Sequence, residues 1–446
     1  MRRQVIGLAA ALAITPLGAS GADLVVWWEE GFNPEEDSAV REIVAAFEQA
    51  SGKQVELVFH PYPELPFKIV AAFEATELPD FAIAQDFVDY TAQWAVDDRL
   101  VDLTDTIGSF SSLFDADALA WAMLPDPQTG QRALFALPIG RSTNHVHIWT
   151  SLLERAGLDL ADIPREWDAF WSFWCDQVQP AVRQALGRDD IWGIGLPMSV
   201  QAFDTQFEFF HFVAANKADY VTRDGQLVID DPRIRRGLIK AIDGYTAIYR
   251  KGCTPPDSVT WGDIDNNKRF LAQSVVMTPN ETLSIPNALK RERPEDYYEN
   301  TATIEWPLGE HGEPFPIGGL IYPAVVFKGG HNVSTAKEFV RFLVAEGWLA
   351  HYLNFSGERF LPTISKILDQ PFWLDPRDPH RMAPVMQVAS RPLAHHYDGA
   401  AGNWRHALVR QQHVWQTAIH RIVTEGISPE QAVDEAIARI KQILAD

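Results

Sequence analysis

The first part of the chain alternates between short apolar runs and segments with helical spacing. Residues 23–28 are rich in valine and tryptophan, which is typical of a strand, and a polar loop follows them. From Ser38 apolar residues recur every three or four positions until Gly52, so a helix is expected there. The next elements are expected at 55–59 (strand), 66–75 (helix) and 81–84 (strand). This order predicts an α/β sheet with helices on its faces.

Ligands of such sheets collect beyond the carboxyl ends of the strands. The first expected strand ends with Trp27, Trp28 and Glu29, and the third leads to Asp86. These four residues are therefore the first candidates for a binding site.

The remaining chain continues with strands and helices and contains no internal repeat and no low-complexity linker. Strand-like runs at 133–139 and 146–149 are joined by the polar segment 140–145. Helices are expected at 151–156, 166–179, 201–214, 231–250 and 429–444. A chain of 446 residues is long enough for two lobes. Short crossings, and not a flexible tether, are expected to join them.

The N-terminus has the pattern of a secretory signal peptide. Two arginines precede an apolar run at 5–14, Pro16 breaks this run, and small residues at 19–22 suit a signal peptidase. We therefore expect residues 1–22 to be removed on export to the periplasm. No cysteine near this point can carry a lipid, and no later stretch has the roughly 20 apolar residues of a membrane span.

The charge of the chain limits its partners. It has 60 acidic and 38 basic residues, hence a formal net charge of −22. Nucleic acids and anionic membranes are poor partners for such a chain. Its 15 tryptophans point either to aromatic surfaces in a binding site or to thick hydrophobic cores.

No catalytic or cofactor motif accompanies this composition. Glu29 and Glu30 are adjacent in one loop, as are Glu35 and Glu36, and such carboxylates do not face each other across a glycosidic bond. The sequence lacks a GxSxG elbow, an HExxH motif, a P-loop and a GxGxxG fingerprint after a strand. We interpret a secreted α/β protein without these motifs as a binding protein that needs no cofactor.

Metal binding is not expected either. His145 and His147 share one side of a strand, but no third ligand has a defined spacing from them. Cys175 and Cys253 lack the CxxC spacing of a zinc site. In an oxidising compartment these two cysteines either form a disulfide or remain two buried thiols.

Several short motifs, in order along nearly the whole mature chain, carry a resemblance to a known family. They are Leu-Pro-Asp at 78–80, Leu-Val-Asp-Leu at 100–103, the strand at 134–138, Gly-Ile-Gly-Leu at 193–196, Trp-Gly-Asp at 261–263 before Phe-Leu-Ala at 270–272, and Leu-Pro at 361–362. The chain resembles the extracellular solute-binding proteins of bacterial carbohydrate ABC transporters, the maltose-binding-protein-like group of family 1. It departs at Ile148-Trp149-Thr150, where members usually show a Tyr-Asn pair, and this bears on which sugar is bound.

The resemblance implies a periplasmic-binding-protein fold of type II, with two α/β lobes around a cleft and three crossings between them. Strand edges rich in glycine, asparagine and threonine place the crossings at 140–145, 277–281 and 318–322. The N-terminal lobe is expected to comprise 23–139 and 280–319, and the C-terminal lobe 140–279 and 320–446. The resemblance further implies a protein that traps a sugar, an oligosaccharide, a polyol or a sugar acid by lobe closure. It would deliver this ligand to the permease of an ABC importer. A monomer is expected, because a cleft that must open and close gains nothing from an obligate interface.

A sugar site needs flat aromatic faces and convergent hydrogen-bonding groups. The aromatic candidates are Trp27, Trp28, Trp261, Trp306 and Tyr322, of which Trp306 is expected to serve packing alone. The polar candidates at strand ends or crossings are Glu29, Asp86, Arg141, Asn144, Asp263, Asn280, Glu281 and Arg359, with Gly319 in the last crossing. Trp261 is the sharpest of these predictions, because its polar loop has few apolar neighbours in sequence and is expected to face the cleft. Its alternative role is that of a core tryptophan.

Two other functions stay open at this point. A non-sugar solute such as a phosphorylated polyol or a polyamine is one of them, and Glu29, Asp86 and Asp263 qualify for the acidic box that a polyamine needs. Arg141 and Arg359 argue against a dication and leave room for an acidic sugar. A secreted enzyme that acts on polysaccharides is the other.

Overall fold

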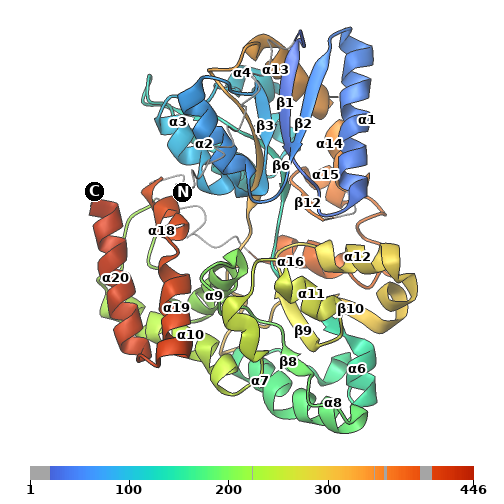
Figure 1. Cartoon of the computed structure of the whole chain (residues 1–446), viewed down its shortest axis with the longest axis vertical. Helices are drawn as coiled ribbons and strands as arrows, with labels where there is room; N and C mark the ends of the chain where they lie inside the picture. Colours follow the sequence, from blue (N-terminus) through green and yellow to red (C-terminus); the bar gives the residue numbers. More distant parts are fainter. Residues whose placement is uncertain (1–20, 223–224, 346, 356–358, 392–403, 446) are drawn as a thin grey trace, which may run out of the picture.

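Two α/β lobes follow each other along the long axis of the molecule (Figure 1). The computed structural model describes residues 21–222, 225–345, 347–355, 359–391 and 404–445. All but the last two residues of the predicted signal peptide at 1–22 lie outside the described residues. Within the described part, no helix combines the length and the apolar character that a membrane crossing needs.

The first lobe is built around a six-stranded sheet of order β12-β6-β11-β3-β1-β2. Its strands are β1 (Leu24–Glu29), β2 (Val55–His60), β3 (Phe81–Ile83), β6 (Leu137–Arg141), β11 (Ile321–Val326) and β12 (Leu361–Pro362). β1 runs parallel to β2 and β3, whereas β11 lies antiparallel between β3 and β6. The parallel strands at the start of the chain confirm the predicted α/β sheet.

Helix α1 (Pro34–Ser51) of this lobe begins before the expected Ser38. Pro34 suits the first helical position, and Glu36 Oε1 accepts a hydrogen bond from the Asn33 backbone at 3.1 Å. The helix ends at Gly52, whose φ of 71° is the left-handed conformation that favours glycine. The other elements are α2 (Leu65–Ala75), η1 (Gln85–Asp89), α3 (Thr91–Val96), α4 (Thr104–Ile107), η2 (Gly108–Leu113), α5 (Ala116–Ala122), β4 (Met123–Pro125), β5 (Arg132–Leu134), α13 (Val333–Ala345), α14 (Trp348–Phe355) and α15 (Ser365–Leu368).

The second lobe contains a four-stranded sheet of order β10-β7-β9-β8. Its strands are β7 (His145–Trp149), β8 (Trp192–Ile194), β9 (Val275–Asn280) and β10 (Thr301–Ile304). Its helical segments are α6 (Thr150–Arg155), η3 (Leu160–Asp162), α7 (Trp167–Ser172), η4 (Phe173–Val178), α8 (Gln179–Leu186), α9 (Phe203–Ala215), α10 (Pro232–Arg250), η5 (Pro256–Thr260), α11 (Asp265–Leu271), α12 (Ser284–Glu292), η6 (Asp296–Asn300), α16 (Met382–Ser390), α18 (Arg405–Gln411), α19 (Val414–Glu425) and α20 (Pro429–Ala445).

The strand pairing corrects the expected division of the chain into lobes. β10 lies in the second-lobe sheet, although the sequence analysis assigns 280–319 to the first lobe. β11 and β12 lie in the first-lobe sheet, although 320–446 is assigned to the second. The local apolar pattern of a strand does not encode its partner strands, and these partners decide to which lobe it belongs.

The crossings between the lobes agree with the sequence at two of three places. The chain crosses at 142–144, between β6 and β7, and at 318–320, before β11. The predicted crossing at 277–281 is wrong, because β9 pairs with β7 to its last residue and leads into α12, which packs on α11 of the same lobe. The third crossing follows α15, since His380 already forms hydrogen bonds with β10 of the second lobe.

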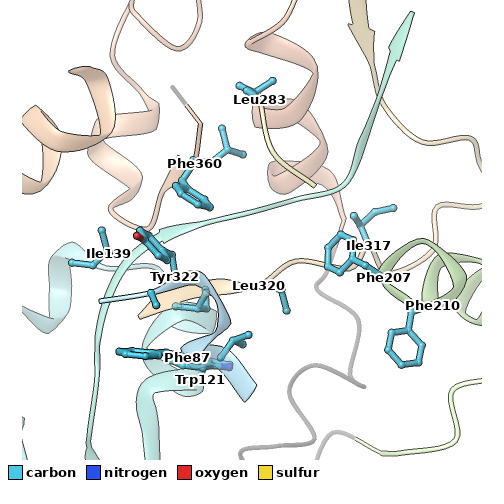
Figure 2. Packing of buried hydrophobic residues seen from close by; sticks show 14 of the residues in the cluster. Phe87, Trp121, Ile139, Phe207, Phe210, Leu283, Ile317, Leu320, Tyr322 and Phe360 are labelled. Carbon is cyan, nitrogen blue, oxygen red and sulfur yellow. The ribbon is translucent and has the colours of Figure 1, made fainter. Parts of the chain in front are cut away.

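One hydrophobic cluster runs through both lobes and the second crossing. Figure 2 shows Ile317, just before this crossing, beside Phe207 of the second lobe, and Leu320 of the crossing between Ile317 and the side chains of Phe87 and Trp121 of the first lobe. The largest fully buried side chains include Trp28, Trp149, Trp174, Trp306, Trp373 and Trp415. The high tryptophan content therefore serves the hydrophobic cores to a large extent.

A disulfide joins Cys175 in η4 to Cys253, which follows α10. Their Cα atoms are 5.2 Å apart, within the usual range for such a bond. The alternative of two buried thiols is therefore excluded in this structure.

Candidate functional site

A cavity of about 320 Å3 lies between the two lobes. The first lobe contributes Glu30, Gly31, Phe32, Pro61, Tyr62, Gln85 and Arg359 to its wall, and the second contributes Asp204, Asp263, Ile264, Asn267, Asn280, Glu281, Thr282 and Ser284. Its size falls at the lower end of the roughly 300–1,000 Å3 of small-molecule sites. Most of the lining residues carry a carboxyl, amide or hydroxyl group, so the cavity suits a small ligand with polar groups.

The first-lobe wall follows the carboxyl ends of three parallel strands. Glu30 and Phe32 come after β1, Tyr62 after β2 and Gln85 after β3. The backbone N–H of Gln85 donates to Glu29 Oε2 at 3.3 Å, which ties the ends of β1 and β3 together. These positions are the ones at which an α/β sheet gathers ligands.

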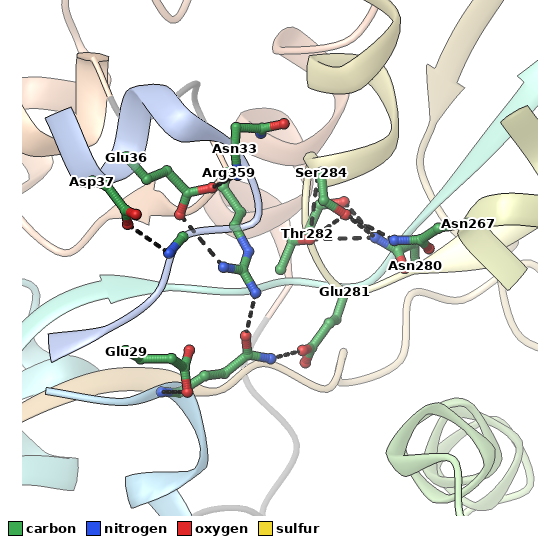
Figure 3. Close-up of polar contacts among 12 residues, drawn as sticks. Glu29, Asn33, Glu36, Asp37, Asn267, Asn280, Glu281, Thr282, Ser284 and Arg359 are labelled. Atoms are coloured by element: carbon green, nitrogen blue, oxygen red, sulfur yellow. Dashed lines mark hydrogen bonds and ion pairs between the residues drawn. The ribbon is translucent and has the colours of Figure 1, made fainter. Parts of the chain in front are cut away.

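Arg359 is the cationic side chain of the described cavity wall. Its Nη2 donates to Gln85 Oε1 at 2.8 Å, and its Nη1 lies 3.4 Å from Glu36 Oε2 (Figure 3). Burial raises the pKa of Glu36, although Arg359 acts in the opposite direction. A side chain at Gly31 would collide with Glu36, so glycine is needed where the start of α1 approaches the cavity. Arg359 therefore lines the cavity and also balances a buried carboxyl group of the first lobe.

Hydrogen bonds hold the carboxylates of the second-lobe wall in place. Asp204 lies in the first turn of α9, and its backbone N–H donates to Asp263 Oδ1 at 3.0 Å. Asn266 Nδ2 donates to Asp204 Oδ2 at 2.8 Å. Asn280, at the end of β9, donates through Nδ2 to Thr282 O at 2.8 Å (Figure 3). The wall is therefore a set of connected polar groups and not a collection of independent loops.

Hydrogen bonds also join the two lobes across the cavity. They run from Tyr62 OH to Asp263 Oδ2 (2.8 Å), from Leu283 N to Arg359 O (3.1 Å) and from Gln85 Nε2 to Glu281 Oε1. The lobes are therefore closed around the cavity in this structure.

Burial raises the pKa of the carboxyl groups at the cavity. The pKa of Glu29 rises to about 7 and that of Glu281 to about 8, mainly through burial. The pKa values of Asp86 and Asp204 lie well above the usual range, first through burial and then because neighbouring carboxylates repel a further negative charge. Burial also raises the pKa of Asp263, although two backbone hydrogen bonds and one side-chain hydrogen bond oppose this.

A comparison with known protein families gives a clear match. Residues 42–383 match the model of the bacterial extracellular solute-binding protein family. The chain belongs to this family. No protein of curated function matches it.

Solved structures share the fold of this solute-binding protein at low sequence identity. An ABC transporter solute-binding protein from Thermotoga lettingae, bound with alpha-D-tagatose, has a TM-score of 0.76 at 16% identity, over 94% of this chain and 99% of that one. Maltose-bound MalE3 of T. maritima has a TM-score of 0.73 at 20% identity, over 94% and 100% of the two chains. The GacH receptor of Streptomyces glaucescens, solved unliganded and with acarbose, has a TM-score of 0.75 at 16% identity, over 95% and 98%. These likenesses confirm the predicted two-lobed fold of a periplasmic binding protein.

Four of the predicted site residues line the cavity of the solute-binding protein: Asp263, Asn280, Glu281 and Arg359. Glu29 is adjacent in sequence to the lining residue Glu30, and its carboxylate accepts a hydrogen bond from the lining residue Gln85. Asp86 follows Gln85, and its charge interacts with that of Glu281. The structure thus brings these six residues together, and their contact with a ligand stays a prediction.

Trp28 and Tyr322 lie in the first-lobe core and Trp27 is half-buried against it, and none of these three predicted aromatic residues belongs to the cavity wall. Trp28 is buried against Phe81, and Tyr322 stacks on Phe360 with ring centroids 4.5 Å apart. Trp27 packs edge-on against a histidine of β2. Side chains of a strand alternate between its two faces, so a position at the carboxyl end of β1 does not by itself direct a ring to the ligand.

Trp261 is 3% exposed and does not line the cavity. The guanidinium of Arg269 lies over its ring, 5.9 Å from the centroid. Asp263 and Ile264 of the same loop line the cavity instead. The burial of Trp261 favours its alternative role as a core side chain, and stacking of a ligand on it stays a prediction. Trp306 is stacked within the second-lobe core, as expected.

The remaining polar predictions lie at the crossings. Arg141 forms a buried ion pair with Asp115, and Asn144 Nδ2 donates to Glu208 Oε2 at 2.5 Å. Gly319 is buried in the second crossing. None of these three predicted residues belongs to the described cavity wall.

The sequence analysis missed many of the lining residues, namely Glu30, Gly31, Phe32, Pro61, Tyr62, Gln85, Asp204, Ile264, Asn267, Thr282 and Ser284. Tyr62 follows the carboxyl end of β2. The rule that ligands collect beyond the carboxyl ends of strands, which selects Glu29, could therefore have selected Tyr62 as well. Asp204 and Asn267 lie on helices, where no local pattern distinguishes a lining side chain from a core one.

A metal site is not found within the described residues. His145 and His147 instead place their Nε2 atoms 3.1 and 3.3 Å from Thr282 O. Burial lowers the pKa of His145 to about 4 and that of His147 well below its usual value, so both rings are neutral near pH 7. This pair positions Thr282, a residue of the cavity wall.

Proposed function

We propose that this protein captures a carbohydrate in the cavity between its lobes and delivers it to the permease of an ABC importer. The observation that carries the proposal is the cavity wall, to which both lobes contribute polar side chains. A ligand in this cavity contacts both lobes at once, so its binding energy favours the closed arrangement.

The chemistry of the wall supports a polyhydroxylated ligand. Each sugar hydroxyl both donates and accepts hydrogen bonds. Asp263 and Glu281 accept, Arg359 donates, and the amide of Asn280 can do both. Phe32 offers a ring for the apolar face of a sugar, in place of the predicted tryptophans. Proteins of the same fold with bound alpha-D-tagatose and maltose support the same ligand class.

The crossings support capture by lobe closure. Each crossing is a short segment that leads from an element of one lobe to an element of the other. Such a connection permits a hinge rotation and prevents wide separation of the lobes. At neutral and alkaline pH we expect the empty protein to open at this hinge and the ligand to close it.

Export to the periplasm, cleavage near residue 22 and a monomeric state belong to the same proposal. The basic start, the apolar run and the small residues of the N-terminus support export. A monomer is expected because opening and closing of the lobes gain nothing from an obligate interface.

A non-sugar amine is the second candidate ligand, because carboxyl groups predominate over cations in the cavity wall. A polysaccharide-active enzyme is less favoured, because the family to which the chain belongs is one of solute-binding proteins.

A ligand screen tests the proposal. Thermal-shift assays against sugars, oligosaccharides, polyols, sugar acids and polyamines should show a carbohydrate that raises the melting temperature with concentration. The ligand should be recovered unchanged, and the radius of gyration should fall on binding. Asp263→Asn should weaken binding, whereas Asp190→Asn, at an exposed position of the second lobe, should not. Binding of polyamines alone, or chemical conversion of the sugar, would replace the proposal with one of its alternatives.

A further inference from the structure

The cavity contains more carboxyl groups than its cations balance. Asp204, Asp263 and Glu281 belong to the second-lobe wall, and Glu29 and Asp86 lie beside the first-lobe wall. In the part of the chain that the structure describes, no ion pair involves any of these five side chains. Burial of so many carboxyl groups without counter-charges is unfavourable.

Arg359, the cation of the wall, is already engaged by the first lobe. Its Nη1 lies 3.4 Å from Glu36 Oε2, and its Nη2 donates to Gln85 Oε1 at 2.8 Å. Its charge acts on Asp263 and Glu281 only through space. The guanidinium of Arg359 also balances the charge of Glu36. The carboxyl groups of the second-lobe wall therefore have no cation in ion-pair contact with them among the described residues.

Unpartnered acceptor atoms are a second and independent sign of a missing donor. Asn267 lines the cavity and is 6% exposed, and its Oδ1 accepts no hydrogen bond. Glu29 is 2% exposed and has an Oε1 without a donor. Buried acceptors are seldom left without a partner, so a donor from the ligand is expected at Asn267 Oδ1, which belongs to the cavity wall.

We propose that the carbohydrate bound in this cavity carries a cationic amine, as an amino sugar or an aminated polyol does, and that this amine lies among Asp204, Asp263 and Glu281. The inference rests on the proposed function and names the class of carbohydrate. An ammonium group supplies up to three donors and no acceptor, which matches a wall rich in acceptors. Its positive charge balances carboxylates that a neutral sugar leaves unbalanced.

A simple polyamine fits the same wall less well. Arg359 Nε is buried and donates no hydrogen bond, so it needs an acceptor from the ligand. A protonated polyamine has no acceptor, whereas the hydroxyl and ring oxygens of an amino sugar have several. The combination of unbalanced carboxylates and an unpartnered guanidinium donor therefore favours an amine on a polyhydroxylated frame.

Isothermal titration calorimetry with matched probes tests the inference. Each set contains an amino sugar, its N-acetyl form and the parent sugar, for example D-glucosamine, N-acetyl-D-glucosamine and D-glucose, with the galactose and mannose sets beside it. Spermidine is the non-sugar control. In the set that fits the cavity, the amine is expected to bind roughly ten- to hundredfold more tightly than its neutral partners, as for hydrogen bonds between charged groups.

Proton release gives a second readout. A cation lowers the pKa of carboxyl groups near it, so binding of the amine at pH 7 should release protons. The release appears as a binding enthalpy that depends on the ionisation enthalpy of the buffer, and the neutral partner should not show it. The charged and titratable groups around the ligand are Glu29, Glu36, Tyr62, Asp86 and Arg359 of the first lobe and Asp204, Glu208, Asp263 and Glu281 of the second.

Two variants with a control complete the test. Asp263→Asn and Glu281→Gln are each expected to weaken binding of the amine tenfold or more, with a smaller effect on the neutral sugars. Asp190→Asn removes one charge at an exposed position and should change neither affinity. If the neutral sugars bind as tightly as the amine, the inference is wrong and the proposed function stands. Binding of spermidine alone, or of no carbohydrate at all, overturns both.

Discussion

Tyr62 of the first lobe and Asp263 of the second are joined by a hydrogen bond of 2.8 Å across the cavity. Burial, and then the charge of Asp263, raise the pKa of Tyr62 well above its usual range, so the phenol stays protonated and donates. The other oxygen of Asp263 accepts from the backbone of Asp204. Because the partners belong to different lobes, this hydrogen bond links capture of a ligand to closure.

Tyr62→Phe removes this hydrogen bond and keeps the ring. We expect ligand affinity to fall about tenfold or more, because a hydrogen bond to a charged group contributes roughly 1.5–3 kcal/mol and Asp263 Oδ2 would lose the Tyr62 hydroxyl as a donor. Tyr249→Phe is the matched control, since its hydroxyl bonds to Pro256 O within the second lobe. Calorimetric titration of both variants measures the effect, and equal affinities would show that the bond does not contribute to capture.

A buried ion pair also joins the lobes. Arg410 Nε in α18 donates to Asp89 Oδ1 in η1 at 2.5 Å, and both side chains are largely buried. Removal of one partner of a buried pair typically costs about 3–5 kcal/mol. Asp89→Asn should therefore lower the free energy of unfolding by about that amount in urea titrations.

The exposed pair of Arg188 and Asp190 serves as the control for the ion pair of Arg410 and Asp89. Asp190→Asn should leave the unfolding midpoint nearly unchanged, because exposed ion pairs contribute little. Similar midpoints for Asp89→Asn and Asp190→Asn would contradict the prediction.

The sequence predicts the elements of the fold well and the assembly of the lobes less well. β1, β2 and β3 are short apolar runs separated by amphipathic or capped helices, so their local patterns suffice. β11 is equally apolar, but it pairs with β3 and β6, which lie far from it in sequence. No local pattern encodes such a partner, and for this reason the expected lobe division is wrong between residue 280 and the crossing that follows α15.

The candidate site was predictable only where polar residues follow a strand or occupy a turn. Asp263, Asn280 and Glu281 meet this condition and line the cavity. Trp28 and Tyr322 also lie near strand ends, yet the alternation of side chains turns them into the core. Burial of a whole face of a sheet depends on tertiary packing. The sequence alone therefore could not distinguish the residues that line the cavity from those that pack into the core.

The disulfide of Cys175 and Cys253 should stabilise the second lobe without affecting the cavity. The two cysteines are 78 residues apart, and a crosslink that closes a loop of this length contributes about 4.5 kcal/mol in the chain-entropy description. Replacement of both cysteines by serine should lower the urea midpoint substantially and leave ligand affinity nearly unchanged. Unfolding of the native protein with and without a reductant gives the same comparison. Coincident unfolding curves would show that the disulfide does not stabilise the protein.

Trp261 tests the choice between a core side chain and a stacking platform. Because it is 3% exposed and outside the cavity wall, Trp261→Ala should destabilise the empty protein by about 3–5 kcal/mol. A stacking role predicts the opposite pattern, a loss of affinity with little change in melting temperature. Measurement of melting temperature and ligand affinity on this variant, with Trp261→Phe beside it, distinguishes the two roles.

The raised carboxyl pKa values make the closed, empty protein sensitive to pH. In the closed structure the pKa of Glu29 is about 7 and that of Glu281 about 8, whereas a hydrated glutamate titrates near 4.3. A raised pKa means that the closed form favours the protonated carboxyl group. The two carboxyl groups therefore stabilise the closed form fully below about pH 4.3, and this stabilisation is lost as the pH rises through 7 and 8.

The empty protein should consequently open as the pH rises from 5 to 8.5. Small-angle scattering should show a larger radius of gyration at pH 8.5, and a bound ligand should suppress the change. Glu281→Gln keeps a neutral group at this position and should reduce the pH dependence, whereas Asp190→Asn should preserve it. An equal radius at both pH values, or opening at the lower pH, would mean that these carboxyl groups do not control closure.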